Sequence, residues 1–204
     1  MSADRHIRER FDADTSAHQV SVLHDDGLYR RLRCQQPGSW VYGFEVVTWP
    51  GYLAYVGDMG SYVFSRIPDM FDFFGSDGIN PSYWAEKLQA AGQDGVSEFA
   101  PERYKEWVEE WREEVLDELD DDQHEEFCAA VDDDMLDYYD SFDEREVYMR
   151  LTDFDSCGIQ ISDASELNFR RFTHHFIWAL YAIVWTIGQY RSLCDSNQEA
   201  VARS

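Results

Sequence analysis

The longest apolar stretch of the chain lies near its C-terminal end and predicts a buried helix. Between Phe176 and Ile187 only Thr186 is polar, and neither Gly nor Pro interrupts the run. The run is too long for one strand and apolar around the whole circumference of a helix, which is typical of a helix buried on most sides. It is shorter than the ~20 residues that a membrane span needs. We therefore expect residues 169–190 to form the helix around which a domain packs.

The N-terminal part of the chain carries the pattern of a half-buried sheet. In residues 28–34 the side chains alternate between two faces, and residues 40–49 are rich in aromatic and β-branched side chains, which favour strands. Residues 52–56 and 61–66 continue the pattern after turns that contain Gly or Pro. Four strands joined by short turns predict an antiparallel meander with one face on the helical half.

From residue 68 onward the pattern becomes helical. Short helices are predicted for residues 70–74 and 80–92, and longer acidic ones for residues 101–119 and for the segment that follows. The two acidic helices each carry an apolar stripe on one side and carboxylates on the other. The apolar stripes consist of Tyr104, Trp107, Val108, Trp111, Val115 and Leu119 in the first helix and of Phe127, Val131, Met135, Tyr138 and Phe142 in the second.

These elements predict an α+β fold: a four-stranded antiparallel sheet followed by a helical half packed around the buried C-terminal helix. We expect one domain over residues 1–204. Its parts are an arm or short helix in residues 1–17, the sheet in residues 20–66, helices in residues 68–192 and a frayed tail in residues 194–204.

Composition adds a strong negative charge to this picture. The formal net charge is −24 and the isoelectric point is near 4.3, which disfavours direct binding to nucleic acid or to an anionic membrane and favours basic partners. The four cysteines are widely spaced, without a CxxC pair, and the N-terminus shows no signal-peptide pattern. We therefore expect free thiols in a reducing cytoplasm.

The negative charge is concentrated in the middle of the chain. Residues 98–146 hold 22 of the 41 acidic residues and only four basic ones. The helix predicted for residues 101–119 is ~28 Å long and bears eight carboxylates, about one per 3.6 Å, close to the ~3.4 Å per phosphate along one DNA strand. Two such rows predict a surface that imitates DNA and occupies a basic groove. The carboxylates expected to contact the partner are Glu106, Glu109, Glu110, Glu113, Asp117, Asp132, Asp133 and Asp137.

Two other interpretations of the acidic helices stay open at this point. Charge runs are commonly the solvated outer face of a protein whose function lies elsewhere. The same surface also suits a basic protein partner without any imitation of DNA. The basic residues Arg30, Arg31 and Arg33 are expected to pair with the chain's own acids or with an acidic partner.

Motifs for catalysis or for cofactor binding are absent from the sequence. There is no GxGxxG, GxxxxGK[ST], GxSxG or HExxH. The runs 120–122 and 132–134 lack the ligand spacing of a calcium loop, and the pair of His124 and Cys128 has no second pair to complete a zinc site. No metal, no cofactor and no catalytic residue is predicted. The alternative is a small enzyme that uses His174, His175 or Cys157 with an acid such as Asp58.

Four stretches carry a resemblance to a known group of proteins. They read TWPG at 48–51, GDMGSYVFSR at 57–66, NPSYWAEKL at 80–88 and HFIWALYAIVW at 175–185. They resemble a family of hypothetical proteins that is common in bacteriophages and other mobile elements. The resemblance covers most of residues 28–190, assigns no residue a role and implies a phage protein acting in the cytoplasm of a bacterial host.

By analogy of class, small acidic phage proteins are often inhibitors of host defence, including anti-CRISPR and anti-restriction proteins. The sequence therefore predicts a non-enzymatic inhibitor that binds the basic groove of a nucleic-acid-binding host protein, plausibly a CRISPR effector, by partial DNA mimicry. A phage adaptor protein that binds through exposed aromatic residues is the remaining alternative.

Overall fold

The chain forms two compact units, each with its own hydrophobic core. The computed structural model describes residues 2–75, 78–93 and 95–202. Unit 1 comprises Met1–Ser97 and Phe172–Ser204, and unit 2 comprises Glu98–Arg171. The sequence predicted one domain in which all helices pack around the last one. Instead, the helices of residues 101–153 bury their apolar side chains in a core of their own.

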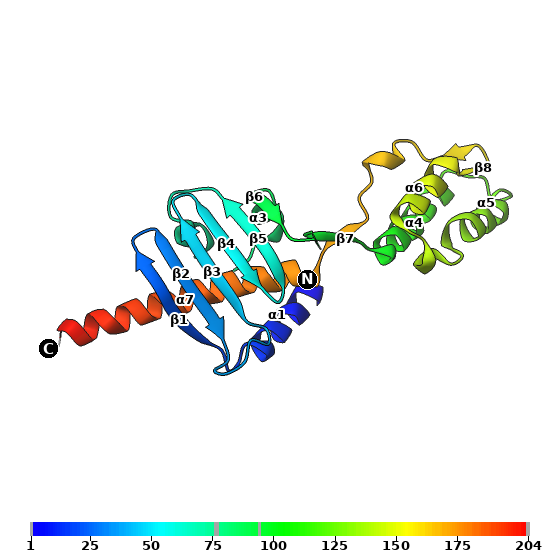
Figure 1. Cartoon of the computed structure of the whole chain (residues 1–204). Coiled ribbons are helices and arrows are strands. Elements are labelled where there is room, and N and C mark those ends of the chain that lie inside the picture. The colour runs from blue at the N-terminus through cyan, green and yellow to red at the C-terminus, as the bar shows by residue number, and fades with distance from the viewer. Residues whose placement is uncertain (1, 76–77, 94, 203–204) are drawn as a thin grey trace. The chain divides into compact units, whose positions relative to one another are not determined.

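Unit 1 contains a six-stranded antiparallel sheet in the order β1-β2-β3-β4-β5-β6 (Figure 1). The predicted four-stranded sheet is therefore wrong in its number of strands, while the α+β class is correct. The strands are β1 (Gln19–Asp26), β2 (Tyr29–Gln35), β3 (Phe44–Trp49), β4 (Tyr52–Gly57), β5 (Gly60–Ser65) and β6 (Leu88–Ala91).

The two strands that the sequence did not reveal lie at the edges of the sheet. Seven of the eight residues of β1 are exposed, and a register shift follows Val22, so its side chains carry little alternation. The sequence of β6, Leu-Gln-Ala-Ala, favours a helix. Its backbone nevertheless pairs with β5 from Tyr62 to Phe64, because ladder hydrogen bonds outweigh a weak local propensity.

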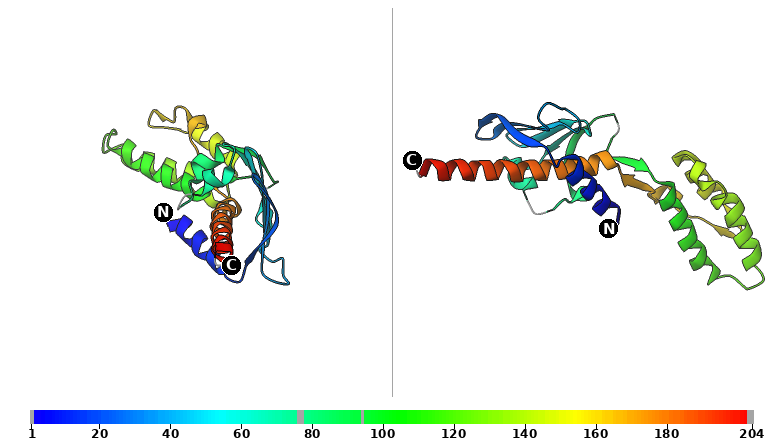
Figure 2. Two further views of the ribbon diagram at one scale, coloured as in Figure 1. Left: turned by 90° about the vertical axis from the view of Figure 1, so that its left-hand side faces the viewer. Right: turned by 90° about the horizontal axis from the view of Figure 1, so that it is seen from below.

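Helix α7 (His174–Ala202) covers one face of the sheet, with α1 (Ser2–Asp14) packed beside it (Figures 1 and 2). Phe176, Trp178, Leu180 and Ile183 are fully buried, which confirms the core helix predicted from the apolar stretch. The helix begins later than predicted, because residues 170–172 form strand β10 (Arg170–Phe172). The Thr173 hydroxyl accepts a hydrogen bond from the Phe176 amide and caps the helix.

The sheet contributes alternate side chains to this core. Leu32, Val46, Leu53 and Phe64 are fully buried against the helices, which is the period of two expected for a sheet with one buried face. The short helix α2 (Met70–Phe74) ends before Gly75, as predicted. Helix α3 (Pro81–Ala85) ends seven residues before the predicted stop at Gly92, because the chain turns into β6.

Unit 2 begins in β7 (Ser97–Phe99) and is mainly helical. Its core contains Tyr104, Val108, Phe127, Val131 and Leu151, all fully buried. Its elements are α4 (Pro101–Leu116), α5 (His124–Val131), the π-helix η1 (Asp132–Leu136), the 3₁₀ helix η2 (Tyr139–Ser141), α6 (Glu144–Asp153), the hairpin β8 (Asp155–Ser156) and β9 (Ile159–Gln160), and the 3₁₀ helix η3 (Ala164–Glu166).

The second acidic helix is shorter than its apolar stripe suggested. It runs as α5 to Val131, continues as the π-helix and stops at Asp137, whose backbone is extended. Met135 and Phe142 are buried as predicted, but Tyr138 is exposed. The helix has ended at Asp137 and Tyr138 has a left-handed backbone conformation, so its side chain no longer follows the helical period of the stripe.

The chain ends were predicted to be an arm and a frayed tail. Residues 2–14 form helix α1, and helix α7 continues to Ala202. Residue 1 of the arm and residues 203–204 of the tail lie outside the described residues. Within the described part of the chain, no helix is both long and apolar enough to cross a membrane.

Candidate partner-binding surface

A row of carboxylates runs along the outer side of α4. Glu106, Glu110, Glu113 and Asp117 are all exposed. At about 100° per residue they fall within about 60° of one another around the helix axis, on the side opposite the buried stripe. We call these four residues the acidic ridge. Since the ridge stands on a helix whose other face is fixed in a core, its carboxylates have a defined spacing.

Two of the eight predicted contact residues are neutralised within the molecule. Lys105 pairs with Glu109 at 3.5 Å, and Arg112 pairs with Asp132 at 2.9 Å. Both basic side chains lie on the flank of α4 that faces η1 and η2, where the Lys105 ammonium also lies 5.4 Å from the Tyr139 ring centroid. The pairs remove Glu109 and Asp132 from the strongest part of the surface, and the pair of Arg112 and Asp132 also ties α4 to the π-helix.

The two other predicted contacts lie at the π-helix. Asp133 lies within it and Asp137 directly follows it, and both are exposed. The Asp137 amide donates to the Asp132 carbonyl at 2.7 Å, the five-residue hydrogen bond that closes the π turn. None of the ion pairs among the described residues involves either carboxylate. Within the described part of the chain, the structure therefore leaves six of the eight predicted carboxylates without an ion pair, in two groups: the acidic ridge on α4, and Asp133 with Asp137 at the π-helix.

The density of the ridge is lower than the sequence implied. Helix α4 ends at Leu116, and the four ridge residues span ~17 Å, about one carboxylate per 5.5 Å at 1.5 Å per residue. One DNA strand advances ~3.4 Å per phosphate. The estimate of one per 3.6 Å counted all eight carboxylates of residues 101–119. Besides the ridge it included Glu102 and Glu109, which the structure pairs with Arg171 and Lys105, and the exposed Glu114 and Glu118, which lie beside the ridge around the helix axis. The match to a DNA strand is therefore partial.

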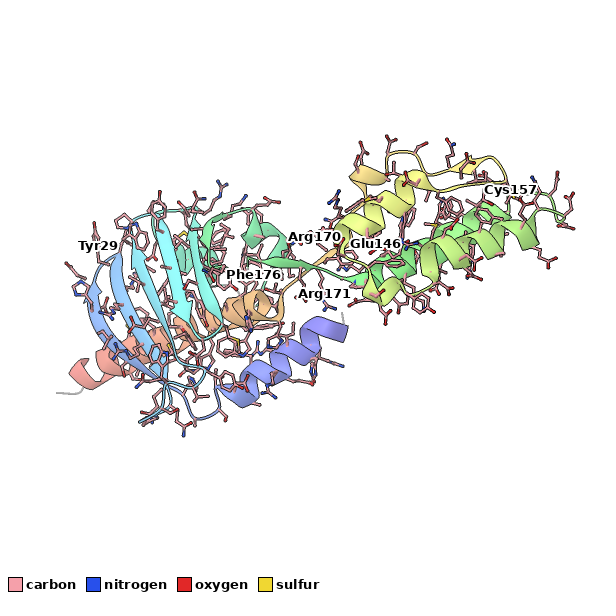
Figure 3. All side chains as sticks on the ribbon, turned by 45° about the vertical axis from the view of Figure 1, so that its right-hand side comes forward. Tyr29, Glu146, Cys157, Arg170, Arg171 and Phe176 are labelled. Carbon is pink, nitrogen blue, oxygen red and sulfur yellow. The ribbon has the colours of Figure 1, made fainter. Side chains whose placement is uncertain are left out.

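The whole of unit 2 is nonetheless strongly negative. Residues 98–171 contain 26 acidic and seven basic side chains, a formal charge of −19, which leaves −5 for the rest of the chain. Arg170 pairs with Glu144, and Arg171 pairs with Glu98 at 2.8 Å. Both arginines are labelled in Figure 3. Even if every basic side chain neutralises one carboxylate, most carboxylates of the unit remain without a counter-charge.

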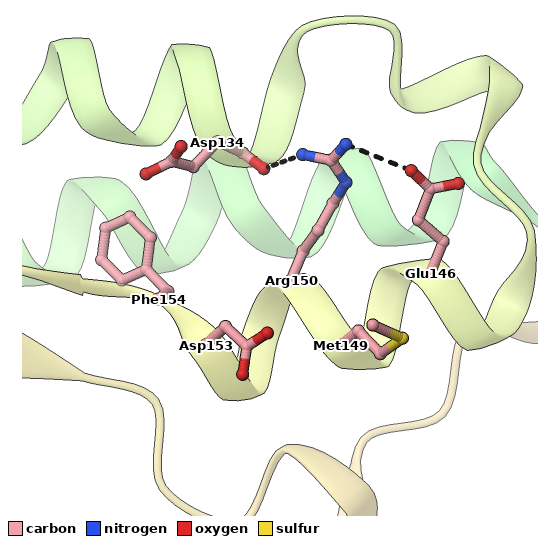
Figure 4. A pocket seen from close by; sticks show the side chains of 6 residues that line it. All are labelled: Asp134, Glu146, Met149, Arg150, Asp153 and Phe154. Atoms are coloured by element: carbon pink, nitrogen blue, oxygen red, sulfur yellow. Dashed lines mark hydrogen bonds and ion pairs between the residues drawn. The ribbon is translucent and has the colours of Figure 1, made fainter.

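A surface pocket of about 320 Å³ opens beside the π-helix (Figure 4). At its centre the Arg150 guanidinium donates to the Asp134 carbonyl at 2.6 Å and pairs with Glu146 at 3.1 Å. The same guanidinium lies 4.0 Å from the Phe142 ring centroid. The full lining is Asp134, Glu146, Met149, Arg150, Asp153 and Phe154. These contacts make Arg150 the link between α6 and the π-helix.

We expect Arg150→Met to lower the free energy of unfolding of unit 2 by about 1.5–2 kcal/mol. Methionine keeps the apolar stem but loses a charge-assisted hydrogen bond and a cation–π contact. Arg145→Met is the matched control, since Arg145 lies exposed on the same helix and should change stability by less than ~0.5 kcal/mol. Urea unfolding followed by helical circular dichroism measures both variants, and equal effects would contradict the assigned role of Arg150.

The residues of the alternative enzyme site do not form a recognisable catalytic arrangement within either unit. In unit 1, the Asp58 carboxylate accepts from the Tyr42 amide at 2.8 Å. His174 and His175 are both exposed, with ring centroids 6.2 Å apart, and desolvation followed by the charge of His175 lowers the pKa of His174. In unit 2, the Cys157 thiol lies 3.9 Å from the Gln123 carbonyl oxygen.

Metal ligands are likewise not gathered at any point of the described residues. No three His, Cys, Asp or Glu side chains there lie in a group that could hold a metal ion. His124, half of the suspected zinc pair, contacts the Leu119 carbonyl oxygen through Nε2 at 3.2 Å. All four cysteines are free thiols, and burial raises the pKa of Cys34 to about 12.

The basic cluster of unit 1 pairs with acids of the same chain, as one of the two predictions proposed. Arg30 makes a bidentate ion pair with Asp69 at 2.8 and 2.9 Å. Arg31 and Arg33 share the Glu45 carboxylate, and the hydrogen bond from Arg31 is the main reason why the pKa of Glu45 is lowered. Since these guanidinium groups already have counter-charges, the cluster gives no sign of a phosphate site.

Comparison with known proteins adds no relative to this description. No family model, curated protein or solved structure matches the chain. The resemblance to phage-encoded hypothetical proteins therefore stays a prediction, and the function has to be argued from the surface of unit 2.

One exposed residue of this surface was placed wrongly by the sequence pattern. Tyr138 was expected in the apolar stripe, but its side chain is 79% exposed between Asp137 and Asp140. The sequence contains no signal that separates Tyr138 from the buried residues, since Phe127 also follows four acids within six positions and is fully buried.

Proposed function

We propose that this protein is an acidic inhibitor that occupies the basic groove of a nucleic-acid-binding protein. The observation that carries the proposal is the acidic ridge, together with Asp133 and Asp137, on a unit with a formal charge of −19. Carboxylates held at fixed positions on a helix repel nucleic acid and attract clustered Lys and Arg side chains over several ångströms. The ridge then competes with the phosphates that the groove normally binds.

The setting of this activity is part of the same proposal. The four stretches that resemble phage proteins support a role against host defence in the bacterial cytoplasm, with a CRISPR effector or a restriction enzyme as the target. The spacing of the ridge carboxylates, which is wider than that of phosphates, supports partial rather than complete imitation of a DNA strand. The proposed action requires neither catalysis nor a cofactor.

The decisive variant removes the four charges of the ridge: Glu106→Gln, Glu110→Gln, Glu113→Gln and Asp117→Asn. The basic partner is first captured from a bacterial lysate at low salt. It should dissociate from the wild-type protein as the salt concentration is raised, because exposed charges are screened. We expect the ridge variant to bind the captured partner at least about tenfold more weakly, measured by displacement of a labelled DNA duplex.

A second variant with the same net charge provides the control. Glu9→Gln, Asp26→Asn, Glu166→Gln and Asp195→Asn also remove four exposed carboxylates, none of which has an ion pair among the described residues. This variant should bind like the wild type. If the two variants lose affinity equally, only the overall charge matters and the ridge is not the binding surface. If neither loses affinity, the acidic face serves only solvation.

A further inference from the structure

Tyr138 occupies a backbone conformation that a tyrosine rarely adopts. Its φ is 63° and its ψ is 24°, the left-handed region, where the Cβ of any residue but glycine crowds the backbone. The conformation is held by Ser141, whose amide and hydroxyl both donate to the Tyr138 carbonyl at 2.9 and 2.7 Å. Glycine or asparagine would fit this position with less strain.

The other residues with this conformation have a visible reason for it. Tyr42 donates its amide to Asp58, accepts from Arg10 at its hydroxyl and packs near Trp178. Cys157 is half-buried at a two-residue hairpin turn, and Asp163 belongs to a residue type that tolerates the region. At Tyr138, in contrast, the described residues supply no hydrogen bond, ion pair or ring contact to the side chain. Folding stability therefore does not account for a tyrosine at this position.

The neighbouring aromatic rings of the same turn show what a ring here can bind. The Lys105 ammonium lies 5.4 Å from the Tyr139 ring centroid, and the Arg150 guanidinium lies 4.0 Å from that of Phe142. Tyr138 is 79% exposed, and in the sequence it lies between Asp137 and Asp140, whose side chains are also exposed. A ring flanked by carboxylates suits a cation that can stack on its face while the acids accept its hydrogen bonds.

We propose that Tyr138 is an anchor for an arginine side chain of the basic partner, so that the strained turn holds the ring out as a contact residue. Arginine is favoured over lysine, because a planar, weakly hydrated guanidinium stacks on an aromatic face and still donates to carboxylates on either side. This inference rests on the proposed function, since it assumes that the partner of unit 2 is basic.

The test uses the full chain and two peptides of equal charge, octa-arginine and octa-lysine, both acetylated and amidated. Tyr138→Gly should bind octa-arginine about three- to fivefold more weakly, since one exposed cation–π contact is lost, and should bind octa-lysine almost unchanged. Tyr138→Phe should keep the affinity for octa-arginine. Tyr29→Ala, which removes an exposed tyrosine of unit 1, is the control and should change neither affinity.

The melting temperature separates a contact residue from a structural one. The melting temperature of Tyr138→Gly should be about 2 °C higher than that of the wild type, because the backbone strain is relieved. An unchanged affinity for octa-arginine, an equal loss for octa-lysine or a fall in the melting temperature would each overturn the inference. The ridge variant tests the proposed function separately, since it should weaken the binding of both peptides whatever the role of Tyr138.

Discussion

Trp178→Ala is expected to lower the free energy of unfolding of unit 1 by about 4 kcal/mol. Trp178 is fully buried, with its ring centroid 5.0 Å from that of Phe11 and 5.7 Å from that of Phe44. Its removal leaves a large cavity between α1, α7 and the sheet, and such truncations cost about 3–5 kcal/mol. The indole also donates a hydrogen bond to the Asp14 carboxylate at 3.3 Å. The substitution therefore removes one hydrogen-bond donor from a carboxylate that is largely buried.

Trp40→Ala is the matched control for this variant. Trp40 is 44% exposed in the turn before β3, and its loss should change stability by less than about 1 kcal/mol. Both are measured by thermal unfolding, for which 4 kcal/mol corresponds to a fall of about 15 °C in the melting temperature of a unit of this size. Similar melting temperatures for the two variants would show that α7 is not the centre of the core.

Asp69→Ala is expected to cost unit 1 about 2–3 kcal/mol. The Asp69 carboxylate has two roles: it pairs with Arg30 through two hydrogen bonds, and it caps α2 by accepting from the Phe71 amide at 2.9 Å. The Arg30 guanidinium is largely buried, 4.6 Å from the Phe71 ring centroid and 5.7 Å from that of Tyr190. The variant therefore loses a helix cap and leaves a mostly buried cation without its counter-ion.

The effect of Asp69→Ala should depend on pH. The hydrogen bond from Arg30 is the main cause that lowers the pKa of Asp69 in the folded protein. A carboxyl group with a lowered folded pKa stabilises the fold above its unfolded pKa of about 3.9, and this stabilisation is lost as pH falls through the folded value. The stability difference between wild type and variant should be full at pH 7 and shrink below about pH 4.

Asp72→Ala provides the comparison for the pH series. Asp72 lies on the same short helix and contacts Arg191 at 3.5 Å, but its side chain is mostly exposed. Its loss should change stability by less than about 0.5 kcal/mol at any pH. A pH-independent effect of Asp69→Ala would contradict the role of its charge and leave only the loss of the cap.

Much of the local structure could be predicted because it depends on neighbouring residues. The strands around the turns at 50–51 and 57–60, the start of α4 at Pro101 and the stop of α2 before Gly75 all follow from short-range geometry. The edge strands could not, because β1 is almost wholly exposed and β6 has the composition of a helix. Only pairing with a neighbouring strand fixes such segments.

The candidate site was predictable in composition but not in arrangement. The sequence places the exposed carboxylates of α4 on one side, since helical spacing alone determines that side. It does not show that Arg112 neutralises Asp132, because this pair depends on how the flank of α4 meets η1, whereas the pair of Lys105 and Glu109 follows from helical i,i+4 spacing. Nor does it show that the helix ends at Asp137, which takes Tyr138 out of the apolar stripe.

The sequence by itself determined that the apolar run of residues 176–187 is a core helix, the α+β class and the concentration of acidic residues in the middle of the chain. These follow from the length of one apolar run, from side-chain periods and from composition, which need no knowledge of distant contacts. The tertiary structure alone decided that the acidic helices form a unit with a separate core, and which carboxylates remain free. Both depend on contacts between residues far apart in the chain, whose free energies local sequence does not encode.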